Sequence, residues 1–207
     1  MKLYGNPMST CTRKVLFLLA EKNAKFDFEV LDFGKGEHKS PDHVARQPFG
    51  QVPALDDDGF ELFESRAMLR YLDERLEGPS FTPKDLKKRA LMEQWISVET
   101  SNFTVPAMKI IYQRIFHPMR GLPVDAAAVE EGRTALGRCL DIMEKQLGKT
   151  KYVAGDELTL ADIGYLPYIE YIFAGGDGDL VTSRPNVSRW WTELSSRPSW
   201  QKATGKN

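Results

Sequence analysis

The patterning of this 207-residue chain changes near residues 77–84, and this change constrains its fold most. Before this segment, strand-like and helix-like runs alternate, whereas after it no run shows strand alternation and the apolar residues recur at helical spacing. The segment reads Glu-Gly-Pro-Ser-Phe-Thr-Pro-Lys, a composition typical of a linker. We therefore expect a small α/β domain at residues 1–78, a linker at 79–84 and an all-helical domain at 85–207.

The first domain is predicted to have the order β-α-β followed by β-β-α. Two short apolar runs joined by acidic residues and a glycine have the pattern of a β-hairpin. In chain order, we expect a strand at 2–5, a helix at 10–22, a strand at 26–31, a short helix from Pro41, hairpin strands at 51–55 and 60–63, and a helix from Ser65.

The second domain is predicted to contain only helices. The expected stretches are 85–116, with a kink near Val105-Pro106, then 124–147, 159–173 and 186–197. Thr159 and Asp162 have the spacing of a capping box at the start of the third stretch, and Leu158 and Ile163 can form its hydrophobic staple. Loss of this box should cost about 1 kcal/mol or more of stability.

Charge and composition exclude several classes of protein. The 28 Lys and Arg residues balance 29 Asp and Glu residues, so the basic excess of a nucleic-acid-binding domain is absent. The longest apolar run, 15–20, is too short to span a membrane, and the N-terminus has no signal-peptide pattern. Cys11 and Cys139 form no metal-ligand spacing and only three histidines are present, so we expect no metal and a reduced, cytoplasmic protein.

A first candidate site lies between the first strand and the first helix. A chain that passes through a proline turn into a helix brings backbone N–H groups and the positive helix end to one point. The residues there are Pro7-Met8-Ser9-Thr10-Cys11-Thr12-Arg13. Ser9 could donate a hydrogen bond to an anion, or Ser9 or Thr10 could simply cap the helix.

Three further places can bind polar groups. If the Val52-Pro53 peptide is cis, the Val52 backbone can face outward and pair with an extended ligand, whereas a trans proline at a sheet edge is the ordinary alternative. Glu64 and Ser65, between a strand and a helix, suit the ammonium and carboxylate of an amino acid, or form an ordinary N-cap. His38 and Lys39 could meet a second carboxylate, or belong to a solvated charged loop.

The order of these motifs resembles the cytosolic glutathione S-transferases, and most closely the serine-type phi class. The resemblance covers essentially the whole chain and is carried by segments 7–15, 36–39 (Gly-Glu-His-Lys), 48–53 (Pro-Phe-Gly-Gln-Val-Pro) and 62–67 (Leu-Phe-Glu-Ser-Arg-Ala). It implies a thioredoxin-like first domain, a helical second domain and the conjugation of glutathione, as co-substrate, to small hydrophobic electrophiles. It also implies a homodimer, with the aromatic Phe49 entering the partner subunit.

The resemblance assigns roles residue by residue. Ser9 would stabilise the glutathione thiolate. Lowering a thiol pKa by about two units from about 8.5 takes roughly 2.7 kcal/mol, which one charge-assisted hydrogen bond and a helix end can supply. The glutathione-binding set would be His38 and Lys39 at the glycine carboxylate, the Val52-Pro53 segment at the cysteinyl unit, and Glu64 and Ser65, with Gln51 nearby, at the γ-glutamyl end.

The electrophile pocket, expected between the domains, would include Met8, Tyr112, Phe116 and Met119, although ordinary core packing is equally consistent with the sequence.

Two other mechanisms and two other functions remain open. A tyrosine mechanism is disfavoured because Gly5 stands at the place of the tyrosine. A cysteine mechanism is disfavoured because Cys11 follows the turn proline too late, and we expect its thiol to be buried in the helix. Ser9-Thr10-Cys11 also resembles the zeta class, which isomerises maleylacetoacetate. A non-catalytic ligand-binding protein on the same scaffold is the third possibility.

Overall fold

The computed structural model describes residues 1–206 and divides into two compact units. The first unit contains residues 1–81 and 197–206, and the second contains residues 82–196. The boundary at 81/82 lies inside the expected linker. The C-terminal segment differs from the expectation, because 197–206 belongs with the first unit rather than with the helices of 85–196.

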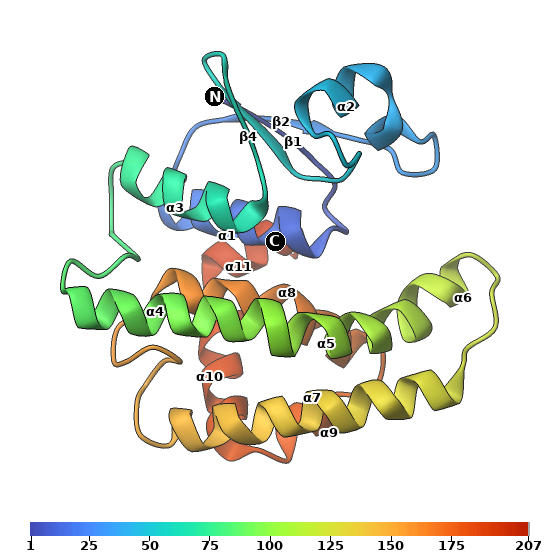
Figure 1. Ribbon diagram of the computed structural model, residues 1–207, viewed down its shortest axis with the longest axis vertical. Coiled ribbons are helices and arrows are strands. Elements are labelled where there is room, and N and C mark those ends of the chain that lie inside the picture. The colour runs from blue at the N-terminus through green and yellow to red at the C-terminus, as the bar shows by residue number, and fades with distance from the viewer. Residues whose placement is uncertain (207) are drawn as a thin grey trace. The chain divides into compact units, whose positions relative to one another are not determined.

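The first unit is built on a four-stranded sheet in the order β2-β1-β3-β4 (Figure 1). The strands are β1 (Lys2–Gly5), β2 (Asp27–Val30), β3 (Ala54–Asp57) and β4 (Phe60–Phe63). β1 pairs parallel with β2 and antiparallel with β3, and β3 pairs antiparallel with β4. The predicted β-α-β, β-β-α order and the thioredoxin-like domain are therefore confirmed.

The first hairpin strand begins later than expected. β3 starts at Ala54 rather than at residue 51, because Pro53 has no N–H to contribute to a ladder. The turn is confined to Asp58 and Gly59, whose φ angles of 54° and 92° fit the two-residue hairpin turn. Asp57 therefore lies within β3, where its carboxylate accepts a hydrogen bond of 2.7 Å from the Tyr71 hydroxyl.

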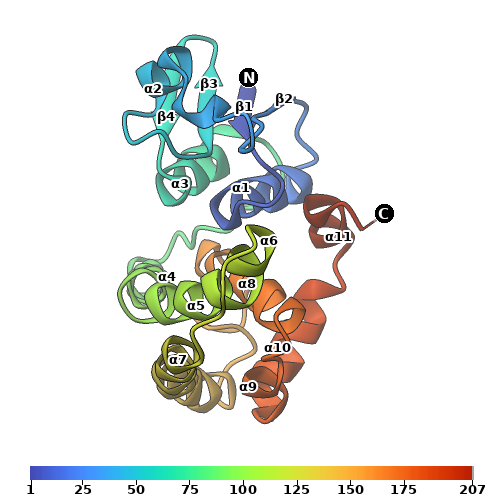
Figure 2. The same cartoon turned by 90° about the vertical axis from the view of Figure 1, so that its right-hand side faces the viewer.

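The helices of the first unit are α1 (Thr10–Glu21), η1 (Glu37–Lys39), α2 (Pro41–Arg46), α3 (Ser65–Arg75) and α11 (Pro198–Thr204). α1 and α3 pack side by side on one face of the sheet (Figure 1), and their apolar faces bury a core with Leu3 and Leu55. α11 packs beside α1 (Figure 2), where Trp200 meets Phe17 edge to face at 5.9 Å. Arg197 forms an ion pair of 2.7 Å with Glu21, which fixes the start of α11.

The second unit contains only helices among its described elements. They are α4 (Leu86–Val98), η2 (Glu99–Phe103), α5 (Thr104–Ile111), η3 (Tyr112–Phe116), α6 (His117–Met119), α7 (Ala126–Leu147), α8 (Leu160–Ala174), α9 (Asp179–Thr182) and α10 (Pro185–Ser195). η2 and η3 are π-helical turns within one continuous path from Leu86 to Met119. The interruption expected near Val105-Pro106 is the widened turn η2 just before it, because Pro106 cannot donate to the preceding turn.

α8 is the buried centre of the second unit, with α4, α5 and α10 packed around it (Figure 2). Its capping box is present, as the spacing of Thr159 and Asp162 predicts. The fully buried Asp162 carboxylate accepts the N–H of Thr159 at 3.0 Å and its hydroxyl at 3.1 Å. It also accepts the N–H of Val153 at 3.0 Å and the indole N–H of Trp190 at 2.9 Å, so it joins the loop before α8 to α10.

We expect Thr159→Ala to lower the free energy of unfolding by about 1 kcal/mol, the usual cost of losing an N-cap side chain. Thr159→Ser, which keeps the hydroxyl, is the matched control. Urea unfolding measures the stability of both variants. The slope of the unfolding free energy against urea concentration should be the same as in wild type. Equal stability of Thr159→Ala and wild type would show that the Asp162 carboxylate does not need the Thr159 hydroxyl.

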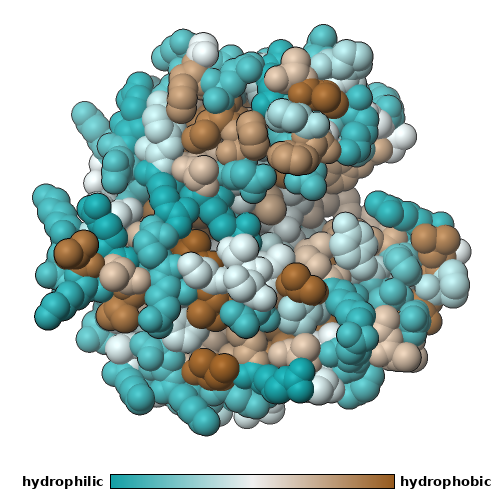
Figure 3. Space-filling model, viewed as in Figure 1, coloured by the Kyte–Doolittle hydropathy of each residue, from teal (hydrophilic) through white to brown (hydrophobic). Residues whose placement is uncertain are grey.

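Apolar side chains on the viewed surface form small patches separated by hydrophilic side chains (Figure 3). Among residues 1–206, no helix has both the length and the apolar composition needed to span a membrane.

Candidate functional site

The register of the sheet brings the predicted motifs to one edge. Tyr4 near the end of β1 pairs with Ala54 at the start of β3, and Ala54 pairs with Phe63 at the end of β4. β2 runs parallel to β1 and ends at the same edge. The Ser9 loop, the Val52-Pro53 segment, the Glu64-Ser65 pair and the loop with His38 and Lys39 therefore all leave the sheet on that side.

Ser9 is the N-cap of α1, and its hydroxyl is still able to donate. The Ser9 Oγ accepts the N–H of Thr12 at 3.2 Å. A hydroxyl has one donor and two acceptor positions, and among the described residues nothing accepts the Ser9 proton. The capping interpretation is thus correct. The N-cap position also places the Ser9 hydroxyl at the positive end of α1, with its proton free to be donated.

The structure leaves no room for a side chain at position 5. A Cβ on Gly5 would lie 2.6 Å from the Thr12 Cγ2 atom. Tyr4 is buried instead in a cluster with Leu31 and Ala54. A tyrosine at position 5 is therefore excluded by packing, and the buried Tyr4 does not replace it.

The two cysteines differ in their surroundings. Cys11 is the second residue of α1 and is half-buried, which is more open than the buried thiol expected there. Cys139 is buried in α7, and this burial raises the pKa of its thiol to about 11. Cys139 is therefore an unreactive core thiol.

The Val52-Pro53 peptide is cis, as predicted. Neither the N–H nor the C=O of Val52 has a hydrogen-bond partner within residues 1–206. The preceding residue is held firmly: the Gln51 carbonyl lies 2.6 Å from Nε2 of His43, and the Gln51 N–H donates to Oε1 of Gln47 at 3.1 Å. The unpaired Val52 backbone thus directly follows a residue whose N–H and C=O are both hydrogen-bonded.

His43 and Gln47, which hold the Gln51 backbone, were not predicted from the sequence. Both are 2% exposed, in or directly after α2. Because a carbonyl only accepts, the His43 ring must carry its proton on Nε2. The one available signal was the position of two polar residues, one in the helix before the proline segment and one directly after that helix.

Glu64 and Ser65 do not form an ordinary N-cap. Glu64 occupies the N-cap position of α3 with a positive φ of 70° and makes no capping bond with its side chain. A non-glycine residue in this region costs about 1–3 kcal/mol, and such residues concentrate at functional sites. The Glu64 side chain is exposed and has no ion pair among the described residues. The Ser65 Oγ is buried without a hydrogen-bond partner in the part of the chain described.

Lys39 and His38 contribute unlike groups. Lys39 donates from Nζ to the Phe49 carbonyl at 3.0 Å, which leaves two of its three donors unused. Its side chain crosses Gly50, where a Cβ would lie 2.7 Å from the Lys39 Cδ atom. Partial burial, together with the charges of Lys39 and His43, lowers the pKa of His38. At neutral pH the cation of the pair is therefore Lys39.

The residues predicted for the electrophile pocket are divided between the units. Met8 is half-buried in the first unit. In the second unit, Tyr112 is 45% and Met119 62% exposed, so neither is a core residue. The Phe116 ring lies 5.4 Å from that of Tyr112 and 5.7 Å from that of Tyr171. Within the described residues, no group of three or more His, Cys, Asp or Glu side chains is arranged to hold a metal ion.

Two family models match the chain. The model described as "Glutathione S-transferase, N-terminal domain" matches residues 1–74, and "Glutathione S-transferase, C-terminal domain" matches residues 103–198. Glutathione S-transferase F13 of Arabidopsis thaliana is 42% identical over 207 residues, covering 99% of this chain and 94% of the relative.

Solved structures agree with these matches. Glutathione transferase F7 from Populus trichocarpa superposes with a TM-score of 0.94 at 40% identity, covering 99% of this chain and 97% of that one. Glutathione S-transferase I from maize, solved with an atrazine glutathione conjugate, has a TM-score of 0.92 at 36% identity, covering 99% and 96%. The relatives at about 40% identity belong to the plant phi class, so the phi-class resemblance is confirmed over the zeta class.

Proposed function

Because this chain belongs to the glutathione S-transferase family, we propose that it joins the thiolate of glutathione to small hydrophobic electrophiles. The observation that carries the proposal is the convergence at one sheet edge of a free hydroxyl proton on Ser9, an unpaired Val52 backbone and the unsatisfied groups of Glu64 and Ser65. The Ser65 Oγ is the buried member of this set, and buried polar atoms without partners are rare in folded proteins and call for an explanation such as a ligand.

Each part of glutathione has a complementary group in this set. Glu64 binds the ammonium of the γ-glutamyl end, and the hydroxyl and N–H of Ser65 bind its carboxylate, with Gln51 beside them. The Val52 backbone, followed by Pro53, pairs with the cysteinyl unit. Lys39 supplies the cation for the glycine carboxylate, and His38, neutral at pH 7, supplies a hydrogen bond rather than a charge.

Ser9 stabilises the thiolate and is not itself a nucleophile. Its hydroxyl donates to the sulfur, while its Oγ continues to accept the Thr12 N–H. The positive end of α1 adds to this stabilisation. The thiol proton leaves to solvent, and the thiolate attacks the electrophilic carbon. With an aryl halide, a carbon–sulfur bond forms and the halide departs with the electron pair of the carbon–halogen bond.

In the second unit, Tyr112, Phe116 and Met119 provide apolar surface for the electrophile. The exposure of Tyr112 and Met119 and the contact of the Tyr112 and Phe116 rings at 5.4 Å support this role, because contiguous exposed apolar side chains mark binding surfaces. The maize relative was solved in complex with an atrazine glutathione conjugate. We assign a detoxifying role to the reaction.

The protein is further proposed to be a cytoplasmic homodimer. Phe49 is 64% exposed although it contacts Phe63 at 6.2 Å between ring centroids, and its free face suits insertion into a second copy.

Steady-state conjugation of glutathione to chlorodinitrobenzene tests the proposed function. We expect saturable turnover in both substrates. An isomerase assay with maleylacetoacetate, run beside it, separates the zeta-like alternative. Glutathione binding with no turnover in either assay would favour the non-catalytic ligand-binding alternative and overturn the transferase proposal.

A further inference from the structure

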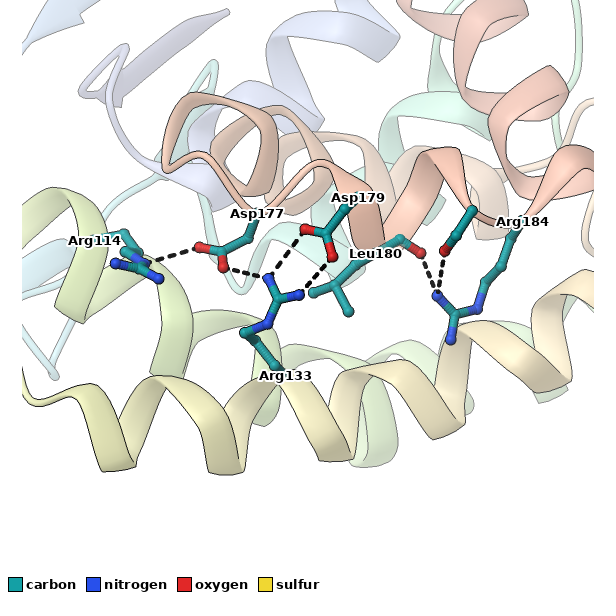
Figure 4. Close-up of polar contacts among 7 residues, drawn as sticks. Arg114, Arg133, Asp177, Asp179, Leu180 and Arg184 are labelled. Atoms are coloured by element: carbon teal, nitrogen blue, oxygen red, sulfur yellow. Dashed lines mark hydrogen bonds and ion pairs between the residues drawn. The ribbon is translucent and has the colours of Figure 1, made fainter.

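A nearly buried carboxylate joins three elements of the second unit. Asp177 lies between α8 and α9, and its side chain is 2% exposed. One of its oxygens accepts from Nε of Arg114 at 3.0 Å, and the other accepts from Nη1 of Arg133 at 2.5 Å (Figure 4). Arg114 belongs to η3 and Arg133 to α7, so this one carboxylate connects η3, α7 and the loop before α9.

The charges of this cluster are balanced. Arg133 also forms a fork with the two carboxylate oxygens of Asp179, at 3.1 and 2.5 Å (Figure 4). The cluster therefore has two guanidinium groups and two carboxylates. Arg133 lowers the pKa of Asp179 through its hydrogen bonds. Because a buried charge is tolerated only when it is paired, Asp177 depends on its two arginine partners, whereas the exposed Asp179 forms its ion pair with Arg133.

The chain also reserves space for the Arg114 side chain. A Cβ on Gly175, just after α8, would lie 2.9 Å from the Arg114 Cβ atom. Gly175 has a φ of −78°, so its backbone does not require glycine. The absence of a side chain at position 175 is therefore explained by the close approach of Arg114.

Arg114 is the middle residue of the turn that presents the aromatic surface. η3 runs from Tyr112 to Phe116, and these two rings contact each other at 5.4 Å. The turn is attached to α8 and the loop after it at two points: Phe116 packs against Tyr171, and Arg114 binds Asp177. Nothing in the chemistry of the glutathione site requires either attachment.

We propose that Asp177 is a positioning residue for the electrophile: by holding Arg114, it fixes η3 and hence the placement of Tyr112 and Phe116. The inference rests on the proposed function, in which those two rings bind the electrophile. Asp177 itself contacts no substrate. Its effect should therefore fall on electrophile binding and leave glutathione binding unchanged.

The test is the kinetic profile of Asp177→Asn, which keeps the size of the side chain but turns one acceptor into an NH₂ donor that faces an arginine. A misplacement of about 1 Å at a positioning group can lower the reaction rate about 100-fold. We expect this loss to include a rise of about 10-fold or more in the KM for chlorodinitrobenzene. The KM for glutathione should change less than about twofold, because Asp177 pairs with Arg114 and Arg133 and neither belongs to the proposed glutathione-binding set.

Two further variants separate positioning from stability. Asp179→Asn weakens the same cluster at Arg133 and does not touch Arg114, so it should lower the melting temperature without raising the KM for the electrophile. Gly175→Ala displaces Arg114 with every charge intact, and should raise that KM even if Asp177→Asn fails to fold. An unchanged electrophile KM in folded Gly175→Ala, or an equal rise in Asp179→Asn, would overturn the inference.

Amide hydrogen exchange over residues 112–119 measures how firmly η3 is held, and it does not depend on enzymatic turnover. We expect faster exchange there in Asp177→Asn and Gly175→Ala than in Asp179→Asn. A wild-type protein that does not conjugate would overturn the proposed function. The exchange rates of the three variants would then still show whether Asp177 and Arg114 hold η3 in place. Equal exchange in all three variants would sink the positioning role.

Discussion

Ser9→Ala should lose most of its conjugation activity while glutathione still binds. The hydroxyl is expected to donate to the developing thiolate, and removing one donor to such an anion typically lowers the rate by about 100- to 1,000-fold. The glutathione-binding groups at Val52, Glu64 and Ser65 are unaffected by the substitution. Turnover with chlorodinitrobenzene and the pKa of the bound thiol, followed by its ultraviolet absorbance, measure the two effects separately.

The capping role of Ser9 makes a second variant necessary. Ser9→Ala also removes the bond from the Thr12 N–H, which costs about 1 kcal/mol of stability. Ser9→Asp keeps a strong N-cap but has no proton to donate at pH 7, so it should be stable and equally inactive. Cys11→Ala should be nearly silent. Turnover close to wild type in Ser9→Ala would eliminate the serine mechanism and direct attention to Cys11.

The order of elements could be predicted because local patterns decide it. Phe26, Phe28 and Val30 have the alternation of a strand, and β2 spans Asp27–Val30. The helix start at Thr10 follows from a proline turn and a capping residue, and α1 begins there. The gathering of the site motifs at one edge then follows from the strand order, since sequence-distant loops meet wherever their strands end together.

Features that depend on contacts between distant segments could not be predicted. Nothing local in residues 197–206 indicates that α11 packs on α1, because the Phe17–Trp200 contact joins opposite ends of the chain. The support of Gln51 by His43 depends likewise on how α2 folds back. The positive φ of Glu64 contradicts its intrinsic preference, as is expected where tertiary structure and function override local propensity.

Glu64→Ala should weaken glutathione far more than the electrophile. The carboxylate is the group proposed to bind the γ-glutamyl ammonium, and it has no competing ion pair among residues 1–206. Glutathione bound there would cover this exposed carboxylate, and truncating one partner of a desolvated charged pair costs about 2–5 kcal/mol. Since 1.4 kcal/mol corresponds to a factor of ten, the apparent glutathione constant should rise about 30-fold or more. The constant for chlorodinitrobenzene, measured at saturating glutathione, should change little.

Two variants at the same position separate the charge from the backbone. Glu64→Gln keeps the shape of the side chain and should lose nearly as much glutathione affinity as Glu64→Ala, because the ammonium needs an anion. Glu64→Gly relieves the positive φ of 70°, so it should unfold at a higher temperature than Glu64→Ala while binding glutathione just as weakly. Calorimetric titration with glutathione and thermal unfolding measure both properties. Wild-type affinity in a folded Glu64→Gln protein would show that the ammonium is bound elsewhere, because the remaining amide cannot replace a carboxylate as its counter-ion.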